Sequence, residues 1–96
     1  MLWYCAYTWH PGTTREQVRQ RIVKQHDTGT NPSDKIRGWY DMVGGGAGFL
    51  LVETDNPQEV NDFLLPYMDL MAWDVRGVNA LQYDQAIERF RQAAGR

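Results

Sequence analysis

The chain has 96 residues, of which 43% are hydrophobic and 23% are charged, and its formal net charge is −2. These values are typical of a single globular domain, here 1–96, and exclude a disordered chain. The acidic balance argues against a nucleic-acid partner, and the longest uncharged apolar run, 47–52, is too short for a membrane-spanning helix of about 20 residues.

The chain begins with a predicted strand and a predicted helix. Residues 2–10 are rich in aromatic side chains and end at Pro11-Gly12, which is typical of a strand followed by a turn. Thr13, with Glu16 three residues later, predicts a capping box, in which the two side chains satisfy backbone N–H groups at the helix start.

A β-hairpin is predicted next, after a polar loop. Residues 35–43 and 48–54 have the composition of strands. Gly44-Gly45-Gly46 lies between them and favours a tight turn, because glycine adopts positive φ without steric strain. A hairpin centred on Gly45 places Arg37 opposite Glu53, Trp39 opposite Leu51 and Asp41 opposite Phe49.

The last part of the chain predicts helix, strand and helix. Asn56 followed by Pro57 is typical of a helix start, and Pro66 should kink or locally unwind the same helix because its ring displaces a backbone hydrogen bond. Residues 73–80 predict a fourth strand, and Asp84 predicts the cap of a terminal helix.

The element order is therefore β-α-β-β-α-β with an extra C-terminal helix. Right-handed crossovers turn this order into an α+β, ferredoxin-like antiparallel sheet with two helices on one face. The expected strand order is 4-1-3-2. The sequence leaves open whether the C-terminal helix packs on its own subunit or on a neighbour.

Three segments carry a family resemblance: Met1-Leu2-Trp3, GFLLVETDNP at 48–57 and MAWDVRGV at 71–78. Together they resemble a small bacterial family, domain of unknown function 3303, over nearly the whole chain. That family resembles the dimeric α/β barrels, in which two such sheets pack face to face. The resemblance implies a homodimer through the sheet face and a pocket, but no particular reaction.

Alternation along the predicted strands separates two sets of side chains. The set expected under the helices is apolar: Leu2, Tyr4, Ala6, Leu50, Val52, Trp73 and Val75. The other set is both aromatic and ionisable: Trp3, Cys5, Tyr7, Trp9, Arg37, Trp39, Asp41, Phe49, Leu51, Glu53, Asp74 and Arg76. Monomers rarely leave such a face open to water, so we expect a second copy to cover it and to enclose a small-molecule pocket.

The expected pocket has named ligand-binding candidates. Contact area would come from Trp3, Tyr7, Trp39 and Phe49, and orientation from Arg37 and Glu53. The Arg37–Glu53 pair is either a cross-strand salt bridge or a polar anchor for a ligand carboxylate or carbonyl. Tyr7 beside Asp41 or Asp74 would place a phenol next to a carboxylate, although both aspartates could equally be solvated residues at strand ends.

If the protein is an enzyme, the catalytic candidates are Glu53, His10 and Tyr7, because each of these side chains can move a proton. His10 is otherwise a surface or capping histidine. His10, His26 and Cys5 lack the spacings of metal signatures, so we expect no metal and no cofactor. His26 is expected to end the apolar stripe of its helix, and Cys5 to be a small buried residue in a reducing cytoplasm.

The RNA-recognition fold shares the βαββαβ order, with aromatic residues on its central strands that stack bases. The segment GGAGFLLV at 45–52 partly matches its third-strand motif, with Phe49 in the stacking position. However, the basic residue that opens that motif is absent, and Glu53 on the same face would repel phosphates. We therefore expect no nucleic-acid partner.

The sequence as a whole predicts a cytoplasmic homodimer whose pocket binds a small apolar or aromatic molecule. A cytoplasmic location is expected because no basic run precedes an apolar one at the N-terminus, so we predict no signal peptide. Two alternatives remain open: a cofactor-independent monooxygenase or isomerase, and a structural dimer without a ligand.

Overall fold

The computed structural model describes residues 1–95. Along the chain it contains β1 (Leu2–Trp9), α1 (Arg15–Asp27), β2 (Ile36–Asp41), β3 (Ala47–Glu53), α2 (Pro57–Leu64), a short 3-10 helix η1 (Leu65–Tyr67), β4 (Met71–Val78) and α3 (Tyr83–Ala94). The strands form one antiparallel sheet in the order β2-β3-β1-β4. The predicted ferredoxin-like order, with an extra C-terminal helix, is confirmed.

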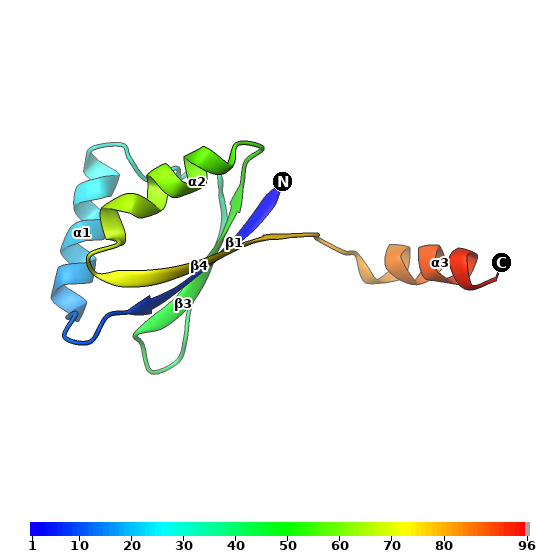
Figure 1. Cartoon of the computed structure of the whole chain (residues 1–96), viewed down its shortest axis with the longest axis horizontal. Helices are drawn as coiled ribbons and strands as arrows, with labels where there is room; N and C mark the ends of the chain where they lie inside the picture. Colours follow the sequence, from blue (N-terminus) through cyan, green and yellow to red (C-terminus); the bar gives the residue numbers. More distant parts are fainter. Residues whose placement is uncertain (96) are drawn as a thin grey trace.

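The hydrophobic core lies between the sheet and two helices, α1 and α2, which lie on the same side of it (Figure 1). The two helices contribute unequally. Val60, Phe63 and Leu64 of α2 are buried, whereas Val18 is the one buried residue of α1. Because α1 buries so little, the sheet itself supplies much of the apolar surface in the core. Burial of such surface is the main stabilising term in folding.

The strand pairing shows that the side of β1 facing the helices is not the predicted one. Cys5 pairs with Leu50 and Tyr7 with Gly48, and Cys5 is 0% exposed. The odd-numbered residues of β1, Trp3 and Trp9 included, thus share the helix side with Leu50. The predicted assignment was wrong for β1, because it placed the more apolar set inward, whereas the larger aromatic set is the buried one.

The β2–β3 hairpin is shifted by one residue from the predicted register. Trp39 pairs with Leu50 and Asp41 with Gly48, instead of the expected Leu51 and Phe49. A shift of one residue moves every side chain to the opposite face. Trp39 and Asp41 consequently lie on the helix side of the sheet, and the prediction that placed them on the other face was wrong.

Arg37 is the extra residue of a β-bulge between Ile36 and Gly38. A bulge inserts one residue without a partner and changes the alternation of the strand. Arg37 therefore does not face Glu53: its guanidinium donates to the carbonyl of Asp34 at 2.7 Å, and the Glu53 carboxylate lies 3.4 Å from the N-terminal amine. The predicted Arg37–Glu53 pair is not formed.

Local signals placed the helix ends to within a few residues. The capping box of α1 uses Thr14 and Gln17, one residue later than predicted. Asn56 caps α2 as predicted, and the helix gives way at Pro66 to the 3-10 turn of η1. His26 is exposed in the last turn of α1 and does not extend its apolar stripe.

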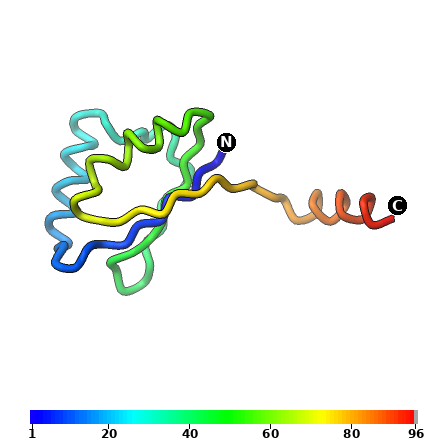
Figure 2. The backbone as a smooth tube through the Cα atoms, in the orientation of Figure 1, coloured from blue at the N-terminus to red at the C-terminus, as the bar shows by residue number. Residues whose placement is uncertain are grey.

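The C-terminal helix α3 projects from the rest of the molecule on an extended arm (Figures 1 and 2). None of its residues is buried, and Gln82, rather than Asp84, occupies its cap position. The radius of gyration is 16.7 Å, compared with about 13 Å for a compact domain of 100 residues. The arm accounts for this expansion.

Within residues 1–95, no helix combines the length and apolar character needed to cross a membrane.

Two adjacent leucines at the end of α2 provide a test of this core. Leu64 is 1% exposed and Leu65 is 65% exposed. We expect Leu64→Ala to lower the free energy of unfolding by about 2–5 kcal/mol, because it leaves a cavity in the core. Leu65→Ala, the matched control, should change it by less than about 0.5 kcal/mol. Urea denaturation followed by circular dichroism measures both, and equal losses would contradict the placement of α2.

Candidate functional site

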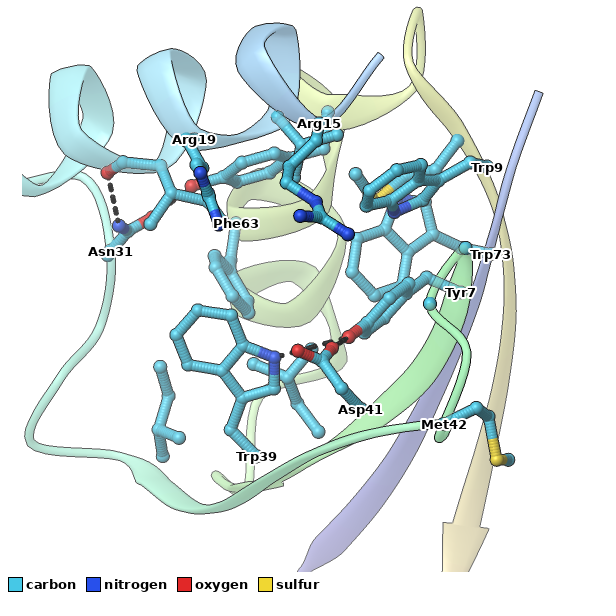
Figure 3. Close-up of a pocket in the computed structure, with 18 of the residues that line it drawn as sticks. Tyr7, Trp9, Arg15, Arg19, Asn31, Trp39, Asp41, Met42, Phe63 and Trp73 are labelled. Atoms are coloured by element: carbon cyan, nitrogen blue, oxygen red, sulfur yellow. Dashed lines mark hydrogen bonds between the residues drawn. The ribbon is translucent and has the colours of Figure 1, made fainter. Parts of the chain in front are cut away.

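An open cavity of about 670 Å³ lies between α1 and the helix side of the sheet (Figure 3). Small-molecule sites in proteins commonly have volumes of about 300–1,000 Å³. Aromatic side chains form much of the wall: Tyr7, Trp9, Trp39, Phe63, Tyr67 and Trp73. The polar and charged side chains in the lining are Arg15, Arg19, Asn31 and Asp41.

The cavity follows from the sequence of α1. Val18 and Ile22 are the apolar residues that this helix directs at the sheet, and Arg15 and Arg19 occupy the positions beside them. Residues three and four apart lie on one face of a helix. Because half of that face is arginine, α1 does not pack tightly onto the aromatic sheet below it, and space remains between the two layers.

A hydrogen-bonded pair, Tyr7 and Asp41, lies at the floor of the cavity (Figure 3). The Tyr7 hydroxyl donates to Oδ1 of Asp41, and Nε1 of Trp39 lies 3.3 Å from the same hydroxyl, to which it donates. Burial raises the pKa of Tyr7 to about 12, and the hydrogen bond to Asp41 acts in the same direction. The phenol therefore keeps its proton at neutral pH.

Gly48 makes room for this pair. The Tyr7 phenol and the carbonyl of Tyr40 lie where a Cβ atom at position 48 would be. Any larger residue would push the phenol out of its place over β3. The glycine is thus part of what directs Tyr7 toward Asp41.

The walls contain hydrogen-bond donors without acceptors. The indole N–H groups of Trp9 and Trp73 are covered from solvent and have no partner within residues 1–95. Asn31 lies at the other side of the cavity (Figure 3), and its Oδ1 accepts a hydrogen bond from the Tyr67 hydroxyl at 2.7 Å. A buried donor without a partner is unfavourable by about 1–3 kcal/mol. These two indole N–H groups therefore stay unsatisfied beneath the surface of the wall.

Two arginines of α1 direct their guanidinium groups into the cavity (Figure 3). Within the described residues, neither Arg15 nor Arg19 forms an ion pair or a side-chain hydrogen bond. Arg21 on the same helix differs, because its two terminal nitrogens bind the Asp69 carboxylate at 2.7 and 2.9 Å. This contact lowers the pKa of Asp69.

A family model described as Domain of unknown function (DUF3303) matches residues 1–94. The chain belongs to this family. The resemblance found in the sequence is therefore confirmed over nearly its whole length. Among curated proteins, none is detectably similar to the chain.

In this DUF3303 chain, two of the six predicted ligand-binding residues meet in the cavity, namely Tyr7 and Trp39. The others lie elsewhere. Trp3 donates from Nε1 to the Thr54 carbonyl at 3.0 Å, and Arg37 is at the bulge. Phe49 and Glu53 belong to the opposite face of β3, because their neighbours Leu50 and Val52 are the buried residues of that strand.

The three predicted catalytic residues do not meet in one place. Tyr7 lines the cavity, whereas Glu53 lies beside the N-terminal amine on the far side of the sheet. His10 is exposed, with Nε2 3.0 Å from the Met68 carbonyl. Their catalytic roles stay predictions.

Of the other side chains in the cavity, Arg15, Arg19 and Trp73 were not named for a site from the sequence, whereas Asp41 was expected beside Tyr7 as one alternative. A signal for the arginines was present, since their four-residue spacing places them on one face beside Val18. Cys5 is buried as predicted, and burial raises the pKa of its thiol to about 11. Within residues 1–95, no three His, Cys, Asp or Glu side chains are grouped to hold a metal ion.

The raised pKa of Tyr7 predicts a loss of stability in alkali. A phenol with a pKa of 10.0 when unfolded and about 12 when folded stabilises the native state fully below pH 10.0, and this contribution is lost as the pH rises toward 12. We expect Tyr7→Phe to make the fall in unfolding free energy between these pH values shallower. Part of the fall should persist, because burial also raises the pKa values of Cys5 and Tyr67.

The control is Tyr83→Phe, at a tyrosine that is 78% exposed on α3. This variant should follow the wild-type pH profile. Urea denaturation at a series of pH values from 8 upward measures all three proteins. Parallel profiles for wild type and Tyr7→Phe would show that Tyr7 is not buried as described.

Proposed function

We propose that this protein binds a small aromatic molecule in the cavity between α1 and the sheet. The observation that carries the proposal is the aromatic wall of a cavity of about 670 Å³. Aromatic side chains offer large apolar contact areas and favour stacked or edge-on contacts with a planar ring. The Tyr7–Asp41 pair supplies a fixed polar point against which such a ring is oriented.

An enzyme of the cofactor-independent monooxygenase or isomerase type is the second candidate. It draws support from the same pair, because a phenol hydrogen-bonded to a carboxylate is a common proton-transfer arrangement. The pKa of about 12 for Tyr7 keeps the phenol protonated, however, so it is a poor base at neutral pH. The aromatic lining of the cavity therefore supports binding more directly than proton abstraction by Tyr7.

We also propose that the protein is a homodimer through the sheet face opposite the helices. Phe49 lies between two tyrosines on this face, with ring centroids 5.0 Å from Tyr4 and 4.9 Å from Tyr40. Tyr40 is 52% exposed. A contiguous aromatic patch of this kind is typical of an interface between proteins. A second copy is the favoured occupant because a two-fold axis pairs one aromatic row with another.

Filling the cavity tests the binding proposal. Ile22 lines the cavity, and its neighbour Val23 is exposed outside it. The neutral fluorescent probe N-phenyl-1-naphthylamine should bind the wild type, and Ile22→Trp should weaken that binding by about tenfold or more, because the indole occupies the space of the ring. Val23→Trp, the matched control, should bind the probe like the wild type. A wild type that does not bind, or an unaffected Ile22→Trp variant, contradicts the proposal.

A charge on the outer sheet face tests the dimer. We expect Phe49→Asp to weaken self-association by about thirtyfold or more, because it places a carboxylate at the centre of the aromatic row. Val43→Asp introduces the same charge at an exposed residue of the hairpin turn and should leave association unchanged. Sedimentation velocity over a range of concentrations measures both. A wild type that stays monomeric would exclude the dimer.

A further inference from the structure

The two arginines of the cavity are the charged groups that the proposed function leaves unexplained. Arg15 and Arg19 are one helical turn apart on α1, and both guanidinium groups point toward the aromatic walls (Figure 3). Like charges at this spacing repel each other and destabilise a helix slightly. The nearest acidic residue in sequence, Glu16, accepts a hydrogen bond from Gln20 at 2.9 Å. The repulsion thus has no compensating partner within the described residues.

Positive and negative charges lie on different sides of the cavity. Two guanidinium groups lie on the α1 side and one carboxylate, Asp41, lies on the floor beside Tyr7. An anionic group is attracted to the arginines and repelled by Asp41, so a ligand carrying one negative charge has one favourable orientation. A second anionic group at the opposite end of the ligand would meet Asp41 and oppose binding.

We propose that the ligand is a small aromatic monoanion, whose carboxylate or other oxyanion is held by Arg15 and Arg19 while its ring lies against the aromatic walls. The inference rests on the proposed function and names its ligand class. Arginine suits this role, because its planar fork of N–H donors matches the geometry of an oxyanion.

A pair of probes separates the anionic group from the ring. We would compare 8-anilinonaphthalene-1-sulfonate with N-phenyl-1-naphthylamine, which has the same ring system without the sulfonate. The wild type should bind the sulfonate more tightly than the neutral probe, and the difference should shrink as salt is added because the arginines are exposed. Arg15→Gln/Arg19→Gln should weaken sulfonate binding by about tenfold or more and leave the neutral probe unaffected.

The matched control is Arg89→Gln/Arg91→Gln, which removes the same charge from exposed positions of α3. It should bind both probes like the wild type. An equal loss of sulfonate binding in both double variants would overturn the inference, because net charge alone would then explain it. An unchanged affinity in Arg15→Gln/Arg19→Gln would overturn it as well.

The remaining outcomes distinguish this inference from the proposed function. If the wild type binds both probes equally and Ile22→Trp blocks both, the cavity binds rings and the anion inference fails alone. If the wild type binds neither probe, the proposed function fails and the inference fails with it. If Arg15→Gln/Arg19→Gln loses both probes, Arg15→Lys/Arg19→Lys decides: recovery of sulfonate binding supports the inference, and no recovery overturns it.

Discussion

The sparse apolar face of α1 is the constraint on which the site depends. Protein interiors are normally close-packed, so a helix with one buried residue, Val18, cannot complete a layer over a sheet rich in tryptophan. The more apolar α2 packs closely against the sheet and forms one half of the core. The other half is left open and is bounded by the aromatic rings below and the arginines above. The cavity thus lies between two layers of regular structure, and the hairpin turn at Gly44-Gly45-Gly46 completes its lining.

The two faces of the sheet have different chemistry. On the helix side, tryptophans surround polar groups with specific partners, such as the Tyr7–Asp41 pair. On the other side, the stacked rings of Tyr4, Phe49 and Tyr40 form a smoother apolar surface. This division allows the lining of the cavity and the outer aromatic surface to change independently in sequence. α3, which has no buried residue, adds a second exposed element on the far end of the arm.

Local sequence signals predicted the elements and their order, because each is punctuated by residues with restricted or unusual backbone preferences. Gly44-Gly45-Gly46 and Asn56-Pro57 are examples, and all three glycines have positive φ. The faces of β1 and β2 were not predictable in the same way, since the face of β1 depends on pairing with distant strands and that of β2 on the exact register of the hairpin and its bulge. The side chains of Tyr7 and Trp39 were therefore expected on the opposite side of the sheet from the one on which they lie.

Because of the β-bulge at Arg37, the set of side chains that faces the cavity depends on the number of residues in β2. It allows Ile36 and Trp39 to point to the same side of β2, although strict alternation would separate them. Loss of this one residue would turn either Ile36 or the pair Trp39 and Asp41 away from the cavity, with no substitution in the lining itself. Within a family built on this fold, single-residue insertions and deletions in the edge strand would change which side chains line the cavity without any substitution in the lining.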